Sequence, residues 1–260
     1  MATNPAPHPF ALVAGRAQAW RGLPRALFDL LLPRECALCA LALEPGESAA
    51  AMCADCASAL PGADMSRCSG CGLRGGPGPC PACRAAGDPT STLVCCDYAP
   101  PADRLVTAFK YGRRLALGRA IGAAMAGRLE LHRRSLPLPA GAALLAVPIA
   151  PARLAHRGFD HAAVLARHVG ARSSLPVITA GLQRVRETRP QPGLARDRRH
   201  DNLRAAMLGS PALAGRPLVL VDDVITSGAT IREAERAARA AGGLPVLRLA
   251  FARTPAPGPA

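Results

Sequence analysis

Residues 218–230 read L-V-L-V-D-D-V-I-T-S-G-A-T, and this stretch decides the fold. Four apolar residues run directly into two neighbouring aspartates, Asp222 and Asp223, and a loop rich in Thr, Ser and Gly follows. The apolar run predicts a buried strand, and the residues after the loop predict a helix. In open parallel sheets, ligands bind outside the carboxyl ends of the strands. The stretch therefore predicts a ligand site on such a sheet.

Three interpretations of the two aspartates compete. The Mg²⁺-binding strand of a P-loop NTPase needs a partner loop G-x-x-x-x-G-K-[ST]. Lys110 is the only lysine of the chain and no glycine loop precedes it, which excludes this class. A strand end that caps the next helix needs only one acid, and two neighbouring carboxylates repel each other. A ribose-phosphate site uses both, because two carboxylates can accept hydrogen bonds from the vicinal hydroxyls of a ribose.

The loop after the aspartates fits a 5′-phosphate. Residues 225–230, I-T-S-G-A-T, offer three hydroxyls and lead into a helix whose first N–H groups attract anions. Gly228 lets the backbone approach a ligand closely. Carboxylates for the diol and amides for the phosphate together predict a ribose 5-phosphate ligand.

Strand and helix patterns alternate from about residue 90, which predicts an α/β fold with a mostly parallel sheet and helices on its faces. The expected strands are 93–98, 143–147, 177–180, 203–208, 217–221 and 245–250. The expected helices are 104–110, 115–131, 160–171 and 228–241. Three parts are expected: residues 1–33, a tail with a short amphipathic helix around residues 20–31; residues 34–88, a Cys-rich segment; and residues 89–260, the α/β domain.

The Cys-rich segment contains four C-x-x-C pairs: Cys36/Cys39, Cys53/Cys56, Cys68/Cys71 and Cys80/Cys83. Each pair can reach one ion from a tight turn, and two pairs complete a tetrahedral Cys₄ zinc site. Two structural Zn²⁺ sites are therefore expected. Sequential pairing of the C-x-x-C units is simplest, and interleaved pairing is possible. Disulfides would need an oxidising compartment, and a redox C-x-x-C is normally single. Zinc would order a segment too poor in apolar residues to fold alone.

The positive charge lies in the second part of the chain. Residues 1–89 contain seven Arg and seven acids, whereas residues 90–260 contain 25 basic and 11 acidic residues, which accounts for the net charge of +14. This excess favours anionic ligands, either phosphorylated small molecules or nucleic acid. The sequence has no signal-peptide pattern and no apolar run of membrane-spanning length, so we expect a cytoplasmic protein without membrane insertion.

The residues of the acidic loop closely resemble the phosphoribosyl pyrophosphate (PRPP) loop of type I phosphoribosyltransferases. The resemblance extends along most of the chain, and the ordered set of motifs resembles the ComF family. After the four C-x-x-C pairs, these motifs are A-F-K-Y-G-R-R, V-P-I-A-P-A-R-L-A-H-R-G-F-D-H, T-R-P-Q-P-G-L-A-R-D-R-R-H-D-N-L-R and V-D-D-V-I-T-S-G-A-T. This resemblance implies a double zinc ribbon followed by a type I phosphoribosyltransferase fold. The chain departs from the family at R-G-F-D-H, where R-G-F-N-Q is usual, and at Ser227, where a second Thr is usual.

The resemblance also implies the roles of the ligand-binding residues. Asp222 and Asp223 would hold the ribose hydroxyls, with Mg²⁺ bridging the hydroxyls and the pyrophosphate. The 5′-phosphate would be bound by Thr226, Ser227, Gly228, Ala229 and Thr230.

The pyrophosphate would lie beside basic residues. Residues 148–153 look like the pyrophosphate-side loop, where Arg153 and Arg157 are candidate anion contacts. Residues 183–204, which include Arg189, match the mobile lid that closes over the pyrophosphate and excludes water. Lys110 is a candidate phosphate contact or reactive amine, and equally a cation favoured at a helix end.

The implied reaction is displacement of pyrophosphate from the anomeric carbon by an acceptor that the sequence does not identify. No strong general base stands out: His156, His161 and His200 are candidates near the motifs, but each is expected at the surface. The alternative is a non-catalytic assembly protein that binds PRPP and single-stranded DNA, because ComF proteins are associated with natural competence and DNA uptake. The basic charge suits a phosphate backbone, whereas the scarcity of aromatic residues disfavours a base-stacking groove. The neutral zinc ribbon is expected to dock a helicase or other DNA uptake proteins.

Overall fold

The computed structural model describes residues 35–44, 51–112, 114–185 and 206–256. The helix expected around residues 20–31 lies outside the described residues, as do Arg189, His200 and most of the expected lid. Among the described helices, none has the length and apolar character needed to cross a membrane.

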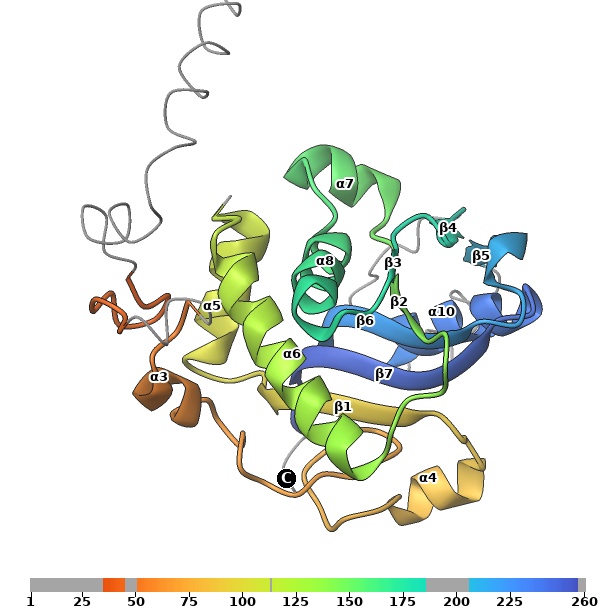
Figure 1. Cartoon of the computed structure of the whole chain (residues 1–260), viewed down its shortest axis with the longest axis horizontal. Helices are drawn as coiled ribbons and strands as arrows, with labels where there is room; N and C mark the ends of the chain where they lie inside the picture. The colour runs from red at the N-terminus through yellow and green to blue at the C-terminus, as the bar shows by residue number, and fades with distance from the viewer. Residues whose placement is uncertain (1–34, 45–50, 113, 186–205, 257–260) are drawn as a thin grey trace, which may run out of the picture.

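A parallel sheet forms the centre of the molecule (Figure 1). Its five strands lie in the order β1 (Ser91–Asp97), β7 (Leu244–Arg253), β6 (Pro217–Ile225), β2 (Ala143–Ala146) and β3 (Val177–Ile178), and every neighbouring pair is parallel. Each of these strands overlaps one of the expected strands. The α/β fold with a parallel sheet is therefore confirmed.

Helices cover both faces of the sheet. One face carries α5 (Ala102–Tyr111), α6 (Leu117–Ser135) and α8 (His161–Ser173), whereas α10 (Ala229–Ala240) packs on the other. Strand β6 alternates accordingly: Val219 and Val221 face the first layer, and Leu218 and Leu220 face the second. A strand buried on both faces reads as a continuous apolar run, which is why residues 218–221 contain no polar residue.

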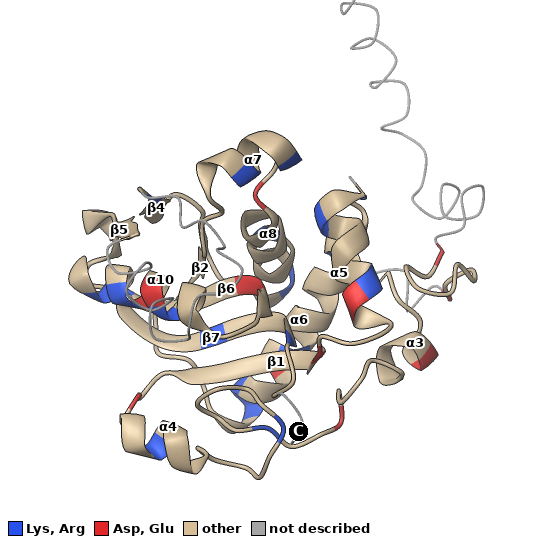
Figure 2. Cartoon of the chain, turned by 180° about the vertical axis from the view of Figure 1, so that it is seen from behind, with Lys and Arg blue, Asp and Glu red and all other residues tan. Residues whose placement is uncertain are grey.

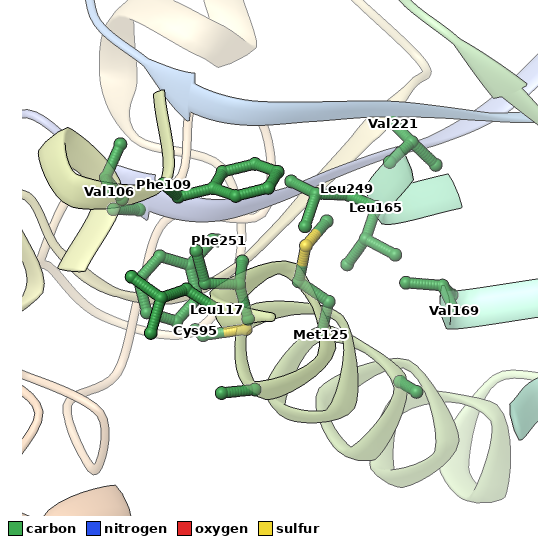
Figure 3. Close-up of a cluster of buried hydrophobic side chains, with 14 of the residues drawn as sticks. Cys95, Val106, Phe109, Leu117, Met125, Leu165, Val169, Val221, Leu249 and Phe251 are labelled. Atoms are coloured by element: carbon green, nitrogen blue, oxygen red, sulfur yellow. The ribbon is translucent and has the colours of Figure 1, made fainter. Parts of the chain in front are cut away.

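The larger core lies between the sheet and the layer of α5, α6 and α8 (Figure 3). Phe109 of α5 and Phe251 of β7 are fully buried there, beside Met125 of α6 and Leu165 of α8. Helices α6 and α8 approach closely at Gly122, where an added Cβ would lie 2.4 Å from the Cβ of His168. This core fixes α8 over β6 and α5 beside α6, and both helices carry residues of the candidate site.

Three local expectations were wrong. Strand β6 does not end at Val221 but continues to Ile225, because β7 runs beside it and pairs with it through Arg253. The described part of the strand expected at residues 203–208 does not join the parallel sheet. Instead, β5 (Met207–Gly209) pairs antiparallel with β4 (Leu182–Arg184) in a separate two-stranded sheet.

The third difference concerns residues 148–153, which were expected to form a loop. Only residues 148–150 form a loop, because α7 (Pro151–Arg157) begins at Pro151. Proline suits the first position of a helix, and Gly158 ends this one with a φ of +79°. These two signals were present in the sequence.

The Cys-rich segment packs beside β1, the edge strand of the parallel sheet. The N–H of Thr92 donates to the carbonyl of Ser69 at 2.6 Å, and the N–H of Asp97 donates to that of Pro61 at 2.7 Å. The segment also contains the short helices α3 (Ala54–Ser58) and α4 (Pro81–Ala86). It therefore satisfies part of an edge that would otherwise remain open to pairing with other chains.

Candidate functional site

The eight cysteines form two clusters, and sequential pairing is the observed one. The first cluster is Cys36, Cys39, Cys53 and Cys56, and the second cluster is Cys68, Cys71, Cys80 and Cys83. Within each, the Sγ atoms lie within 4.8 Å of one another. The Sγ atoms of Cys39 and Cys53 are 3.8 Å apart, which matches the roughly 3.8 Å between the sulfurs of a tetrahedral site with Zn–S bonds of about 2.3 Å. Both clusters can hold zinc.

Backbone N–H groups lower the pKa of one thiol in each cluster. The N–H of Cys53 donates to the Sγ of Cys36 at 3.4 Å, and that of Cys80 donates to the Sγ of Cys68 at 3.1 Å. Burial raises the pKa of Cys36, but the hydrogen bonds from backbone N–H groups outweigh it and lower the pKa to about 6. The same balance lowers the pKa of Cys68 to about 6. Thiolates are the form that binds zinc.

Cys95 and Cys96 of β1 are buried in the larger core, as small strand residues. Burial raises the pKa of the Cys96 thiol to about 12. Neither side chain belongs to a cluster that can hold a metal among the described residues.

Asp222 and Asp223 lie near the carboxyl end of β6, and both are buried. The acidic part of this strand is red in Figure 2. The N–H of Asp223 donates to Oδ1 of Asp222 at 2.9 Å, and the N–H of Val224 donates to Oδ1 of Asp223 at 2.7 Å. Burial raises the pKa of Asp222 well above its ordinary value, and the neighbouring charge of Asp223 raises it further. The two hydrogen bonds hold Oδ1 of each carboxylate against the neighbouring backbone N–H.

Asp223 lies against basic side chains from two helices. The Nζ of Lys110, in the last turn of α5, lies 2.7 Å from Oδ2 of Asp223, and Nε2 of His161 lies 3.4 Å from the same oxygen. Burial raises the pKa of Asp223, but His161 and Lys110 outweigh it and hold the pKa below its ordinary value. The sole lysine of the chain thus forms an ion pair with the acidic motif.

His161 is not a surface residue, contrary to expectation. It is 8% exposed, because Asp160 caps α8 and places the next side chain against β6. Burial lowers the pKa of His161, against the raising effect of Asp223. His161, Asp222 and Asp223 form a third group that can hold a metal ion. The signal in the sequence was the Asp before an apolar helix, which predicts an N-cap.

Arg157 reaches the same site from α7. Its Nη1 lies 3.2 Å from Nδ1 of His161, and its Nη2 donates to the hydroxyl of Tyr111 at 2.8 Å. The guanidinium also lies 4.6 Å from the centre of the Tyr111 ring. Tyr111 directly follows Lys110 on α5, so Arg157 joins α5, α7 and α8 beside the aspartates.

Arg153 is an exposed residue of α7, and its charge acts on Arg184. Burial lowers the pKa of Arg184 in β4, and the charge of Arg153 lowers it further, whereas Asp222 and Glu233 act in the opposite direction. Arg184 therefore lies within electrostatic reach of both Arg153 and Asp222. It lay at the start of the expected lid but was not singled out by the sequence.

The loop from Thr226 to Gly228 connects β6 to α10. Gly228 has a φ of +80°, and an added Cβ would lie 2.6 Å from Nη1 of Arg232, so the position requires glycine. Thr226 and Ser227 are exposed, and the hydroxyl of Ser227 accepts a hydrogen bond from the N–H of Ala229 at 3.3 Å. Ala229 and Thr230 form the first turn of α10, whose N–H groups favour an anion.

Three known proteins are similar to different lengths of this chain. No family model matches it. The DNA utilization protein YhgH of Salmonella typhi is 32% identical over 207 residues, which cover 78% of this chain and 90% of that protein. Competence protein F of Haemophilus influenzae is 27% identical over 148 residues, 56% of this chain and 65% of that protein. An orotate phosphoribosyltransferase of Xanthomonas euvesicatoria is 59% identical over 39 residues, 15% of this chain and 17% of that protein.

Proposed function

Because this chain belongs to the family of the DNA utilization protein YhgH and competence protein F, the ComF family, we propose that it binds PRPP through the acidic end of β6 and the loop that follows. The observation that carries the proposal is the position of Asp222 and Asp223, buried near the carboxyl end of β6, which ends at Ile225 and leads into a hydroxyl-rich loop and the start of α10. The carboxylates suit a ribose diol, and the amides suit its 5′-phosphate.

A magnesium ion fits the same carboxylates. Asp222 and Asp223 offer the oxygen ligands that Mg²⁺ prefers, and with His161 they can gather around one ion. Bound beside the pyrophosphate, Mg²⁺ would neutralise the charge that develops on the leaving group. Lys110 balances part of the acidic charge in the free protein through its ion pair with Asp223. We infer that the ligand's hydroxyls compete for Asp223 and leave the Lys110 ammonium to the phosphate oxygens.

The proposed reaction transfers the phosphoribosyl group to an acceptor. A nucleophile of the acceptor attacks the anomeric carbon, the bond from this carbon to pyrophosphate oxygen breaks, and pyrophosphate leaves with the bonding electrons. Positive charge beside the site, from Arg153, Arg157 and Arg184, would stabilise the leaving group.

Calorimetric titration of PRPP with Mg²⁺ into the zinc-loaded protein tests the binding site. We expect binding in the low micromolar range and, for Asp222→Asn/Asp223→Asn, at least about 100-fold weaker binding, since each carboxylate loses charged hydrogen bonds. The matched control, Asp55→Asn/Asp64→Asn, changes the net charge equally at two exposed positions and should bind like the wild type. A folded wild-type protein that does not bind PRPP would refute the proposal.

Turnover is tested separately, by pyrophosphate release in the presence of candidate acceptors. Lys110→Met should reduce pyrophosphate release more than it reduces PRPP affinity, because the ammonium is expected to act on the leaving group. Equal losses in both would assign Lys110 to binding alone.

A second candidate function is a non-catalytic assembly protein that binds PRPP and single-stranded DNA. The observation that favours it is the excess of 14 positive charges in residues 90–260, together with the DNA utilization role named for the relative. DNA binding through these charges should fall steeply as salt rises, whereas PRPP binding should depend on Mg²⁺ and the two aspartates. PRPP binding without pyrophosphate release from any acceptor, combined with salt-sensitive DNA binding, would support this candidate. Capture of a helicase by the Cys-rich segment would extend it.

A further inference from the structure

Arg253, the last residue of β7, lies between the second cluster and the loop proposed to bind phosphate. Its side chain is buried, at 8% exposure. Its Nε donates to the carbonyl of Cys71, a member of the second cluster, at 2.9 Å. On its other side, Nη1 donates to the carbonyls of Ile225 at 3.0 Å and of Thr226. One guanidinium therefore contacts a cysteine knuckle and the proposed phosphate loop simultaneously.

These contacts set the direction of the loop's donors. The C=O and N–H of a trans peptide unit point in opposite directions. When Arg253 holds the carbonyls of Ile225 and Thr226, it turns the N–H groups of Thr226 and Ser227 away from itself, towards the outer side of the loop. Two further contacts reinforce this arrangement: the N–H of Thr254 donates to the Ile225 carbonyl at 3.0 Å, and Nη2 of Arg232 donates to the Ser227 carbonyl at 3.1 Å.

An arginine side chain is suited to hold two elements in place. The guanidinium presents its N–H donors in a rigid fork, so two elements bonded to it are held in one relative position. Burial lowers the pKa of Arg253, yet the side chain meets the carbonyl of Cys71 within a cluster whose bound thiolates would be negative. Arg253 thus has donors for both elements and a favourable charge on the cluster side.

We propose that Arg253 is a positioning residue that couples the second cluster to the phosphate loop, so that zinc in this cluster orders residues 226–230. The proposed function supplies the ligand of the loop, but the coupling itself is a property of the free protein. The first cluster serves as an internal control, since it packs into the apolar core beneath α5 and α6.

Hydrogen–deuterium exchange of the free, zinc-loaded full chain tests the coupling. In Arg253→Gln, we expect backbone exchange in peptides covering residues 225–230 to rise by about 10-fold, as charged hydrogen bonds to the loop are lost. The same rise is expected in Cys83→Ser, which breaks the second cluster, and no rise is expected in Cys56→Ser, which breaks the first. Combining Arg253→Gln with Cys83→Ser should add little to either change alone.

The outcome that overturns the proposal is equally specific. It fails if the loop exchanges like the wild type in Arg253→Gln, or if both cysteine variants loosen it equally. Exchange in α6 and α8 reports whether each variant is folded. Should Arg253→Gln not fold, Arg253→Lys and Gly70→Ala give the same test. The latter disturbs the second cluster without removing a ligand, since its Cβ would lie 2.7 Å from the Cβ of Cys83.

Titration with PRPP and Mg²⁺ separates this proposal from the proposed function. If the wild type binds PRPP, Arg253→Gln and Cys83→Ser should bind about 10-fold more weakly, because the loop must be ordered at the moment of binding. If the wild type does not bind PRPP, the proposed function fails, and the exchange experiment still decides the coupling.

Discussion

Each of the two cysteine clusters consists of two C-x-x-C units, but the protein holds the clusters in different ways. The first cluster is embedded in apolar packing: Cys36, Leu43, Met52 and Leu60 are buried in the core shared with α5 and α6. The second cluster is tied to the sheet by polar groups, through Thr92, Arg248 and Arg253. Apolar packing is non-directional, whereas hydrogen bonds and ion pairs fix geometry.

The first cluster is therefore expected mainly to stabilise the fold, whereas the second cluster is also expected to fix the positions of the polar groups around it. Arg248 illustrates the second mode. It is 4% exposed, its Nε donates to Glu235 of α10 at 2.8 Å, it pairs with Asp88, and its Nη1 donates to the carbonyl of Gly70 at 3.2 Å. A buried charge of this kind contributes little net stability but is costly to leave unpaired.

The largest effect should come from breaking the first cluster. Cys56→Ser should lower zinc content from two ions to one and lower the free energy of unfolding by more than about 4 kcal/mol, because metal and core packing are lost together. Cys83→Ser should also lose one zinc but cost clearly less in global stability. Zinc analysis and urea denaturation measure both. Equal destabilisation by the two variants would remove the distinction between the clusters.

The next effect concerns the polar attachment. Arg248→Met should destabilise the protein by about 3–5 kcal/mol, since Asp88 and the carbonyls of Gly70 and Thr90 would lose the Arg248 donor and Glu235 would keep only the half-exposed Arg239. The second cluster should then release zinc to a chelator faster, while the first keeps its rate. Arg133→Met is the matched control, because its ion pair with Glu130 is partly exposed and long, at 3.6 Å. It should change stability by less than about 1 kcal/mol.

Local patterns in the sequence were sufficient to predict the parallel sheet and the cysteine sites. The run of residues 218–221 predicted a strand buried on both faces, and the C-x-x-C spacing predicted two sites. The pairing of the C-x-x-C units stayed open, because either pairing satisfies the same spacing. The structure brings consecutive units together.

Contacts between distant residues could not be read from local patterns. Nothing near Arg253 indicates that it reaches Cys71, 182 residues earlier in the chain, and an arginine in an Arg-rich chain is ordinarily expected at the surface. His161 was wrongly expected at the surface, although Asp160 before it signals the start of α8. Asp222, Asp223 and Lys110 were singled out, but the ion pair of Lys110 with Asp223 depends on where the fold places the end of α5 relative to β6. The roles of all these residues in ligand binding remain predictions.

A smaller effect is expected from apolar packing near the first cluster. Met52→Ala should lower the free energy of unfolding by about 2–4 kcal/mol, because it leaves a cavity in the core. Met65→Ala is a matched control of identical chemistry: Met65 is 47% exposed, against 4% for Met52. Denaturation curves should show a shift for the first variant alone. If Met52→Ala is neutral, the first cluster is not held by its apolar surroundings.

The smallest effect separates two polar attachments that share one partner. Asp97, at the end of β1, pairs with Arg67 and Arg74. Arg67 is buried, and it also donates to the carbonyls of Gly62 at 2.7 Å and Gly72 at 3.2 Å. The side chain of Arg74 is 50% exposed. Since water can replace an exposed cation, Arg74→Ala should cost at most about 1 kcal/mol.

Arg67→Ala should cost more than Arg74→Ala, because the buried Gly72 carbonyl and Oδ1 of Asp97 lose their Arg67 donor, and the Gly62 carbonyl keeps only the N–H of Met65 at 3.3 Å. Gly62 lies in the segment after the first cluster, and Gly72 directly follows Cys71 of the second cluster. Through these two carbonyls and Asp97, Arg67 ties both parts of the Cys-rich segment to β1. Amide exchange at residues 61–74 and urea denaturation measure the two variants together. Equal, small effects would show that polar attachment depends on charge near Asp97 alone; a larger effect of Arg67→Ala would show that it depends on buried, directional hydrogen bonds.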